Sequence, residues 1–345
     1  MRWDRLVFFI ARRRPRIPPK FRVSLFLESL NEPFGRARLQ GPRSLVAVRE
    51  QCGQIAATRA PSGRLRRADS DSRAGSCVET CDHSLLSLTR ASRSLDRHQS
   101  FSRDLLSSDE EWEASTSILC FPGGADVPYL NSLGAGGMER VRHYVEEGGV
   151  YIGLCAGAYF ASGAVAFEAG TDLEVIGERY LKFYRGLAAG AAYPGFDYSS
   201  ERGAVSAKIR YINPSNGEWR STMDYVNGGP FWMIDDTDAA VFRINSVNHR
   251  RLDGVDILAT YEDLNHAVAA MRCRVGEGVA ILCGSHPELS HDDIADVAEV
   301  DELYDLVYAE HVARLKENLR QHEAARTEFF AALVAAGLEA KVRNK

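Results

Sequence analysis

The chain has 345 residues, of which 45% are hydrophobic and 26% are charged, a composition typical of a globular protein. Its formal net charge of −5 excludes a general electrostatic attraction to nucleic acid. No stretch is apolar for long enough to span a membrane, so we expect neither nucleic acid nor a membrane as a partner.

The first 75 residues differ in charge from the rest. They contain 17 Lys and Arg against 6 Asp and Glu, a balance of +11, whereas the remaining residues contain 25 against 41, a balance of −16. Residues 45–48 form their only strand-like run. Because such a segment cannot bury a core, we expect residues 1–75 to be a disordered N-terminal extension. The alternative is a stretch included by error in the predicted gene, through a wrong start site or a retained intron. A basic patch for RNA is a further alternative, but aromatic residues do not alternate with the arginines as base stacking requires.

The cysteines bear on compartment and metal binding. Their number, seven, is odd and their spacing is irregular, which favours reduced thiols in an intracellular protein. No accompanying set of His and Cys has the spacing of zinc ligands, so we expect no metal and no cofactor. We expect a cytoplasmic location, and the Arg-rich, acid-poor start of the chain leaves mitochondrial targeting as the alternative.

From residue 76 onward, helix and strand patterns alternate, and we expect one domain over residues 76–340. The patterns predict a helix over residues 80–93, a buried strand over 117–121, a turn over 122–126, an amphipathic helix over 138–147 closed by Gly148 and Gly149, and a buried strand from 149 to 152. Strand, helix and strand in this order predict a right-handed parallel βαβ unit. The expected fold class is therefore α/β, a mostly parallel sheet flanked by helices with added β-rich segments.

The second half of the chain is richer in strands. Residues 167–203 are loop-rich, and residues 225–230 carry a strong turn signal. Strand-like runs follow at residues 239–243, 255–261, 267–273 and 279–283, and the last two are expected to form a hairpin through residues 276–278. We expect one long helix over residues 301–323 and another over 327–336, ended by Gly337.

A single stretch, residues 149–160, suggests chemistry. Its first half is strand-like and its second half helix-like, and Cys155 lies between them in the sequence Gly153-Leu154-Cys155-Ala156-Gly157. This is the thiol counterpart of a nucleophile elbow, in which a sharp strand-to-helix turn exposes the nucleophile. A following helix N-terminus favours a thiolate and offers an N–H group to an oxyanion.

His286 is the best candidate for the general base. It follows the strand-like run at 279–283, and the carboxyl ends of parallel strands share one edge of a sheet, so we expect it to meet Cys155. Glu288 would accept a hydrogen bond from the imidazole and fix its tautomer. The backbone N–H groups of Gly124 and Ala156 would form an oxyanion hole.

Other residues receive weaker interpretations. A lone cysteine after a buried strand is usually a small core residue, and we assign Cys120, Cys273 and Cys283 to the core. The residues that could contact a ligand at the rim of the crevice are Asp126, Tyr129, Tyr159 and Asn227.

These motifs resemble the class I glutamine amidotransferase superfamily, and more closely the N-terminal domain of eukaryotic biotin–protein ligases. The shared stretches are FPGGADVPY at 121–129, GLCAGAY at 153–159, YPGF at 193–196, NGGP at 227–230 and GSHPEL at 284–289. The resemblance covers about residues 76–340. It implies an amidotransferase-like, flavodoxin-like α/β fold, with Cys155, His286 and Glu288 at the triad positions.

The chain also departs from these families. Amidotransferases that hydrolyse glutamine usually have Gln where this chain has Tyr159, which counts against glutamine as the substrate. The biotin- and ATP-binding part of a ligase does not follow residue 340, so we expect no biotin ligation by this chain alone. Two interpretations stay open: a cysteine-dependent enzyme acting on an amide or acyl group of an unknown small molecule, and a non-catalytic module that binds a small ligand or partners a separate biotin ligase catalytic domain.

Overall fold

The computed structural model describes residues 7–10, 46–48, 100–102, 111–213, 216–233, 254–297 and 303–343. The helix expected at 80–93, the strand expected at 239–243 and most of the N-terminal extension lie outside these residues. Within residues 1–75, two segments are described, and both are strands, β1 (Val7–Ile10) and β2 (Val46–Val48). Among the described residues, no helix combines the length and apolar character needed to cross a membrane.

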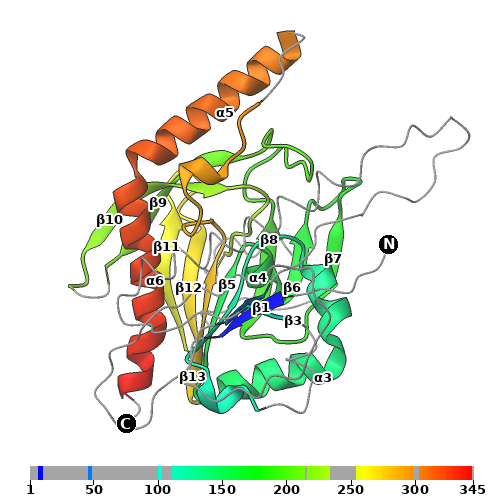
Figure 1. The fold of residues 1–345 in the computed structure, drawn as a ribbon, viewed down its shortest axis with the longest axis vertical. Coiled ribbons are helices and arrows are strands. Elements are labelled where there is room, and N and C mark those ends of the chain that lie inside the picture. Colours follow the sequence, from blue (N-terminus) through cyan, green and yellow to red (C-terminus); the bar gives the residue numbers. More distant parts are fainter. Residues whose placement is uncertain are drawn as a thin grey trace, which may run out of the picture.

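The chain forms an α/β fold around a sheet of ten strands, in the order β1-β3-β2-β4-β5-β13-β12-β11-β9-β10 (Figure 1). The strands not yet given are β3 (Ser100–Ser102), β4 (Ile118–Phe121), β5 (Val150–Leu154), β9 (Val205–Ile212), β10 (Trp219–Val226), β11 (Val255–Tyr261), β12 (Val268–Val275) and β13 (Gly278–Cys283). The pairs β2–β4, β4–β5 and β5–β13 are parallel, and the strands from β13 to β10 pair antiparallel. The α/β class is thus confirmed, with the parallel part at the centre.

The connection from β4 to β5 is the expected βαβ unit. The short helix η1 (Glu113–Ser115) precedes β4, and α3 (Asp126–Glu146) follows it, starting earlier than the periodicity predicted. Gly134 interrupts α3 with a φ of 61°. Gly148 closes the helix as predicted: its φ is 95° and its N–H donates to Val145 O at 3.0 Å.

The part of the chain expected to be loop-rich, residues 167–203, consists mostly of turns and loops but also contains two strands that were not predicted. A second, three-stranded sheet in the order β7-β6-β8 is formed by β6 (Ser162–Phe167), β7 (Val175–Glu178) and β8 (Tyr184–Gly190). The strands of this sheet were missed because glycines interrupt their apolar runs. The backbone packs closely at these glycines, since a Cβ on Gly163 would lie closer than 3.0 Å to Arg185 O.

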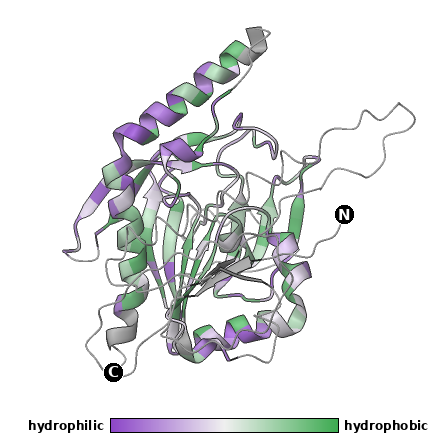
Figure 2. Ribbon diagram, viewed as in Figure 1, coloured by the Kyte–Doolittle hydropathy of each residue, from purple (hydrophilic) through white to green (hydrophobic). Residues whose placement is uncertain are grey.

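Helices cover both faces of the central strands. Helix α4 (Ala156–Phe160) follows β5, η2 (His291–Asp293) follows β13, and α5 (Leu303–Gln321) leads into α6 (Glu323–Arg343). Tyr151 on β5 donates to Gly157 O of α4 at 2.7 Å, whereas its neighbour Val150 faces α6. Successive residues of a strand point to opposite faces, so α6 and α4 cover opposite faces of the sheet. The central strands are hydrophobic, and α5 carries hydrophilic segments along its length (Figure 2).

Gly337 was expected to end the last helix, and this was wrong. Helix α6 continues through it to Arg343. A Cβ at residue 337 would lie 2.8 Å from Val150 Cγ1 and 3.4 Å from Ile281 Cγ1. The glycine therefore permits close packing of α6 on β5 and β13. The cysteines assigned to the core, Cys120, Cys273 and Cys283, are indeed buried.

Candidate active site

The register of the central strands brings three segments to one edge of the sheet. Phe121, the last residue of β4, pairs with Gly153 of β5, and Leu154, the last residue of β5, pairs with Cys283, the last of β13. The three strands are parallel and end at the same level. The residues that follow them, beginning at 122, 155 and 284, therefore lie at the same edge, where open α/β sheets bind ligands.

Cys155 adopts a backbone conformation that is unusual for a residue other than glycine, with φ 48° and ψ −103°. Its N–H donates to Cys283 O at 2.8 Å, and its carbonyl accepts from Ala158 N–H at 3.0 Å. A Cβ on Gly153 would approach Gly157 O closer than 3.0 Å, and a Cβ on Gly157 would approach Phe121 O in the same way. The two glycines therefore let the strand, the turn and α4 pack tightly enough to hold the strained cysteine.

His286 lies beside this cysteine and is itself buried. Its Nδ1 is 2.8 Å from Glu288 Oε1, and Cys155 lies near enough to act on the charge of the imidazole. Because Nδ1 faces the carboxylate, Nε2 is the nitrogen left for the thiol. Burial by itself lowers the pKa of His286. The negative charge of Glu288 is the largest influence in the other direction, and together with Cys155 and the hydrogen bond to Glu288 it raises that pKa well above its usual value. The sequence predicted these three residues as a group, and the structure brings them together.

A buried ion pair supports the loop that carries the imidazole. Arg326 of α6 donates from Nη2 to His286 O at 3.0 Å and from Nε to Asp224 Oδ1 at 2.8 Å. Asp224 and Arg326 are almost fully buried. The His286 N–H donates to Tyr225 O at 2.8 Å, next to Asp224 on β10. Sequence reasoning missed Asp224 and Arg326, since neither stands in a recognisable motif.

A second carboxylate near the site, that of Glu201, was also missed by sequence reasoning. Its Oε2 accepts from Tyr225 OH at 2.5 Å and from Asn227 Nδ2 at 3.3 Å. Burial raises the pKa of Glu201, while Tyr225 and the nearby His286 act in the opposite direction. This carboxylate therefore fixes Tyr225 and Asn227, two residues of the predicted turn.

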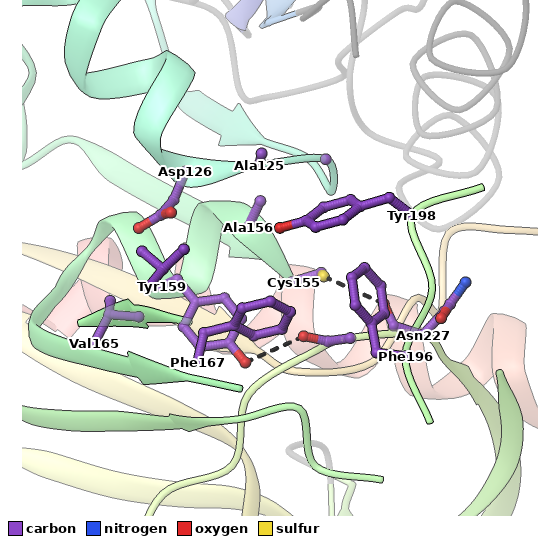
Figure 3. Close-up of a pocket in the computed structure, with 13 residues that line it drawn as sticks. Ala125, Asp126, Cys155, Ala156, Tyr159, Val165, Phe167, Phe196, Tyr198 and Asn227 are labelled. Carbon is purple, nitrogen blue, oxygen red and sulfur yellow. Dashed lines mark hydrogen bonds between the residues drawn. The ribbon is translucent and has the colours of Figure 1, made fainter. Parts of the chain in front are cut away.

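A pocket opens beside the thiol. Its lining residues come from the turn after β4, the elbow, β6, β7, the loop after β8 and the turn after β10: Gly124, Ala125, Asp126, Cys155, Ala156, Tyr159, Val165, Phe167, Val175, Phe196, Tyr198, Asn227 and Gly228 (Figure 3). Its volume of about 40 Å³ is more than the ~10–15 Å³ that one water needs, so a small group fits. Gly124 and Ala156, the two expected oxyanion donors, both line it.

The expected rim residues have different positions. Asp126, Tyr159 and Asn227 line the pocket, and Cys155 Sγ is 3.9 Å from Asn227 O. The Tyr159 hydroxyl donates to Gly228 O at 3.1 Å. Tyr129 is fully buried instead, and its hydroxyl donates to Pro122 O at 3.0 Å, so it supports the turn after β4 from below.

Comparison with known proteins identifies the family. The family described as "Biotin-protein ligase, N terminal" matches residues 72–345. The chain belongs to this family.

Two relatives agree with that assignment. The chain is 33% identical over 209 residues to the biotin–protein ligase of Schizosaccharomyces pombe, which covers 60% of this chain and 31% of the yeast protein. It is 34% identical over 179 residues to an uncharacterized protein of Chlamydia muridarum, covering 51% of this chain and 62% of that protein. The chain thus spans less than two thirds of either relative. A solved glutamine amidotransferase of Thermotoga maritima is similar over 67% of this chain and 82% of its own, with 10% identity and a TM-score of 0.34, a score too low to carry an argument.

Proposed function

We propose that this biotin–protein ligase N-terminal domain is a cysteine-dependent enzyme that acts on an amide or related acyl group. The supporting observation is that Cys155, His286 and Glu288 lie together at the edge of a pocket, with His286 Nδ1 2.8 Å from Glu288 Oε1. A nucleophile, a base and a group that orients the base are the three parts that covalent acyl transfer requires. Among the described residues, no group of three His, Cys, Asp or Glu side chains has the arrangement of a metal site.

The proposed reaction has two steps. The Cys155 thiolate attacks the acyl carbon, a C–S bond forms, and the backbone N–H groups of Gly124 and Ala156 stabilise the developing oxyanion. The C–N bond then breaks as the His286 imidazolium gives its proton to the leaving nitrogen. Water, deprotonated by the neutral imidazole, cleaves the thioester and releases the acid. Glu288 stabilises the imidazolium throughout and does not transfer a proton.

The first test is the pH dependence of Cys155 alkylation by iodoacetamide, followed by mass spectrometry on the folded protein. We expect alkylation well below the free-thiol pKa of about 8.5. The substitution His286→Ala should remove that reactivity. The buried thiols Cys120 and Cys283 serve as internal controls, because they should react only if the protein unfolds. An inert Cys155, or one that titrates like a free thiol in both proteins, contradicts the proposal.

A binding or regulatory module is the second candidate, and the relatives favour it. The matched yeast biotin–protein ligase is about three times longer than the aligned region, so this domain belongs to a family that occurs beside other sequence. In this case the chain partners a biotin ligase catalytic domain. The test is the affinity of the purified chain for such a domain, together with the effect of the chain on the rate of biotin transfer. Absence of both binding and a rate effect excludes the module, whatever the reactivity of Cys155.

A further inference from the structure

We infer that the pocket beside Cys155 selects acyl compounds that carry an amine or ammonium group on an apolar body, and that Asp126 recognises the amine. This inference rests on the proposed function, because it names the substrate class of the same site. It also excludes substrates with a free carboxylate, and therefore free glutamine.

The charges of the pocket lining are the first argument. None of the described residues that line it is Lys, Arg or His, and the lining carries one side-chain carboxylate, that of Asp126. A substrate carboxylate entering this pocket would lose its hydration without gaining a cationic partner from the lining. A group that donates hydrogen bonds, in contrast, can donate to the carboxylate of Asp126.

Asp126 is held so that one of its oxygens remains for a ligand. Arg179 Nε donates to Asp126 Oδ2 at 2.5 Å, while Arg179 Nη1 donates to Gly177 O at 3.2 Å and Glu178 O at 3.1 Å. Arg179 itself does not belong to the lining and is only 5% exposed. The arginine therefore anchors the carboxylate through Oδ2, and among the described residues no hydrogen bond uses Oδ1. Because the carboxylate is already ordered, binding costs little further side-chain entropy.

The rest of the lining selects an apolar body. Val165, Phe167, Phe196 and the ring of Tyr198 form the apolar wall of the pocket around the elbow (Figure 3). The rings of Phe167 and Phe196 lie 5.2 Å apart at 79°, and those of Phe196 and Tyr198 lie 4.6 Å apart at 82°. Aromatic faces favour alkyl groups and cations and disfavour anions. The wall and Asp126 therefore act in the same direction.

Tyr159 limits the depth of the pocket and strengthens the exclusion of amino acids. It lies one turn into α4, and its hydroxyl already donates to Gly228 O. A Cβ on Gly190 would lie closer than 3.0 Å to that hydroxyl, so the ring fills its place completely. The side chain is committed to this internal contact and leaves no second polar partner for a substrate carboxylate.

The experiment compares matched ligands on the full chain with Cys155→Ala, which cannot react and leaves the other lining residues, Asp126 included, unchanged. Leucinamide differs from 4-methylpentanamide only by the amine, and from leucine only by having an amide in place of the carboxylate. A second pair, 6-aminohexanamide and hexanamide, places the amine at the far end of an alkyl chain. By isothermal titration calorimetry we expect the amine of at least one pair to tighten binding about tenfold, since a hydrogen bond to a charged group has that magnitude. We expect leucine to bind more weakly than leucinamide.

Variants of the same protein locate the effect. Asp126→Asn keeps an acceptor for Arg179 but removes the negative charge, and it should abolish the preference for the amine. Asp172→Asn, at an exposed position outside the lining, is the matched control and should change nothing. If Asp126→Asn fails to fold, the ligand pairs still decide the question on the unsubstituted pocket.

The inference is overturned if neither amine tightens binding, if leucine binds as well as leucinamide, or if none of the compounds binds at millimolar concentration. Its failure is distinguishable from that of the proposed chemistry. Selective binding of amines with an ordinary, unreactive Cys155 supports the pocket and refutes the enzyme. A reactive Cys155 without selectivity for amines supports the enzyme and refutes the inference about the pocket.

Discussion

The substitution Gly123→Ala tests whether the imidazole position controls the reactivity of the cysteine. A Cβ at residue 123 would lie closer than 3.0 Å to His286 Cε1, whereas ordinary contacts begin at 3.4 Å. The ring must therefore retreat by at least 0.4 Å. Such a displacement is costly, because the ring is buried and held by Glu288 at 2.8 Å.

The expected magnitude follows from how steeply such reactions depend on geometry. Misplacement of a catalytic group by about 1 Å costs roughly 10²-fold in rate. For a displacement of at least 0.4 Å, we expect the rate of Cys155 alkylation near pH 6.5 to fall about tenfold or more. The loss should be smaller at high pH, where the thiol ionises without help from the imidazole. The assay is iodoacetamide labelling of the folded protein over a pH series, read by mass spectrometry.

The matched control is Gly136→Ala, on α3. A Cβ there meets nothing within 4 Å, so this variant adds the same methyl group without touching the site. It should label like the unsubstituted protein and melt at the same temperature or slightly higher, because alanine favours a helix. The reasoning is refuted if Gly123→Ala is folded by its melting curve and retains the full pH profile of labelling.

Three further predictions concern the groups around the imidazole. Burial lowers the pKa of His286 and Glu288 is the largest influence that raises it, so Glu288→Gln should bring that pKa down. A raised pKa in the folded state stabilises the fold fully below about pH 6.5, the unfolded value, and this stability is lost as pH rises through the folded pKa. Urea denaturation should therefore show that the free energy of unfolding falls as pH rises in that window, by at most ~1.4 kcal/mol per pH unit. In Glu288→Gln this dependence on pH should be weaker. An unchanged dependence contradicts the role of Glu288 in raising the pKa of His286. Arg326→Met should lower the free energy of unfolding by about 3–5 kcal/mol, because it leaves the Asp224 carboxylate buried without its cation. Adding Asp224→Asn should recover part of this loss in a double-mutant cycle. Strictly additive losses in the two variants would contradict the pairing. Tyr159→Phe should cost about 1–3 kcal/mol by orphaning a buried carbonyl and leave the pH midpoint of thiol labelling unchanged; a shifted midpoint would give the hydroxyl a chemical role.

The central strands and the strand-end residues could be predicted because their signals are local. The apolar runs that became β4, β5 and β13 are buried along their whole lengths. Parallel pairing then dictates a shared edge, so Cys155 and His286 could be placed together although about 130 residues separate them. The hairpin of β12 and β13 could also be predicted from the local sequence, and the pairing of Val275 with Gly278 confirms it.

Strands β9 and β10 were both missed, although the sequence of β9 contains a usable signal. In β9 the buried Ala207, Ile209 and Tyr211 alternate with polar residues, and this period of two is typical of a strand with one buried face. The second sheet is different. Its strands are short and interrupted by glycines, and each depends on its neighbours for burial, so no single segment predicts it.

The supporting residues of the site could not be predicted, because their partners come from distant parts of the chain. Arg326 is 102 positions from Asp224 and 40 from His286. Nothing in the sequence around a single arginine distinguishes a buried support from a solvated helix face. Glu201 has the same character, since its contacts with Tyr225 and Asn227 exist only after the loop folds over β10.

The geometry separates the position of the nucleophile from that of its base. Cys155 is tied to β13 by the hydrogen bond from its N–H to Cys283 O at 2.8 Å, and His286 lies three residues beyond the end of that strand. The distance between thiol and imidazole is therefore set chiefly by backbone pairing between two adjacent strands. Glu288 and Arg326 act only on the ring and on its loop. Loss of either should change how the base is oriented and charged while the elbow keeps its shape, so the site can lose its reactivity without losing its pocket.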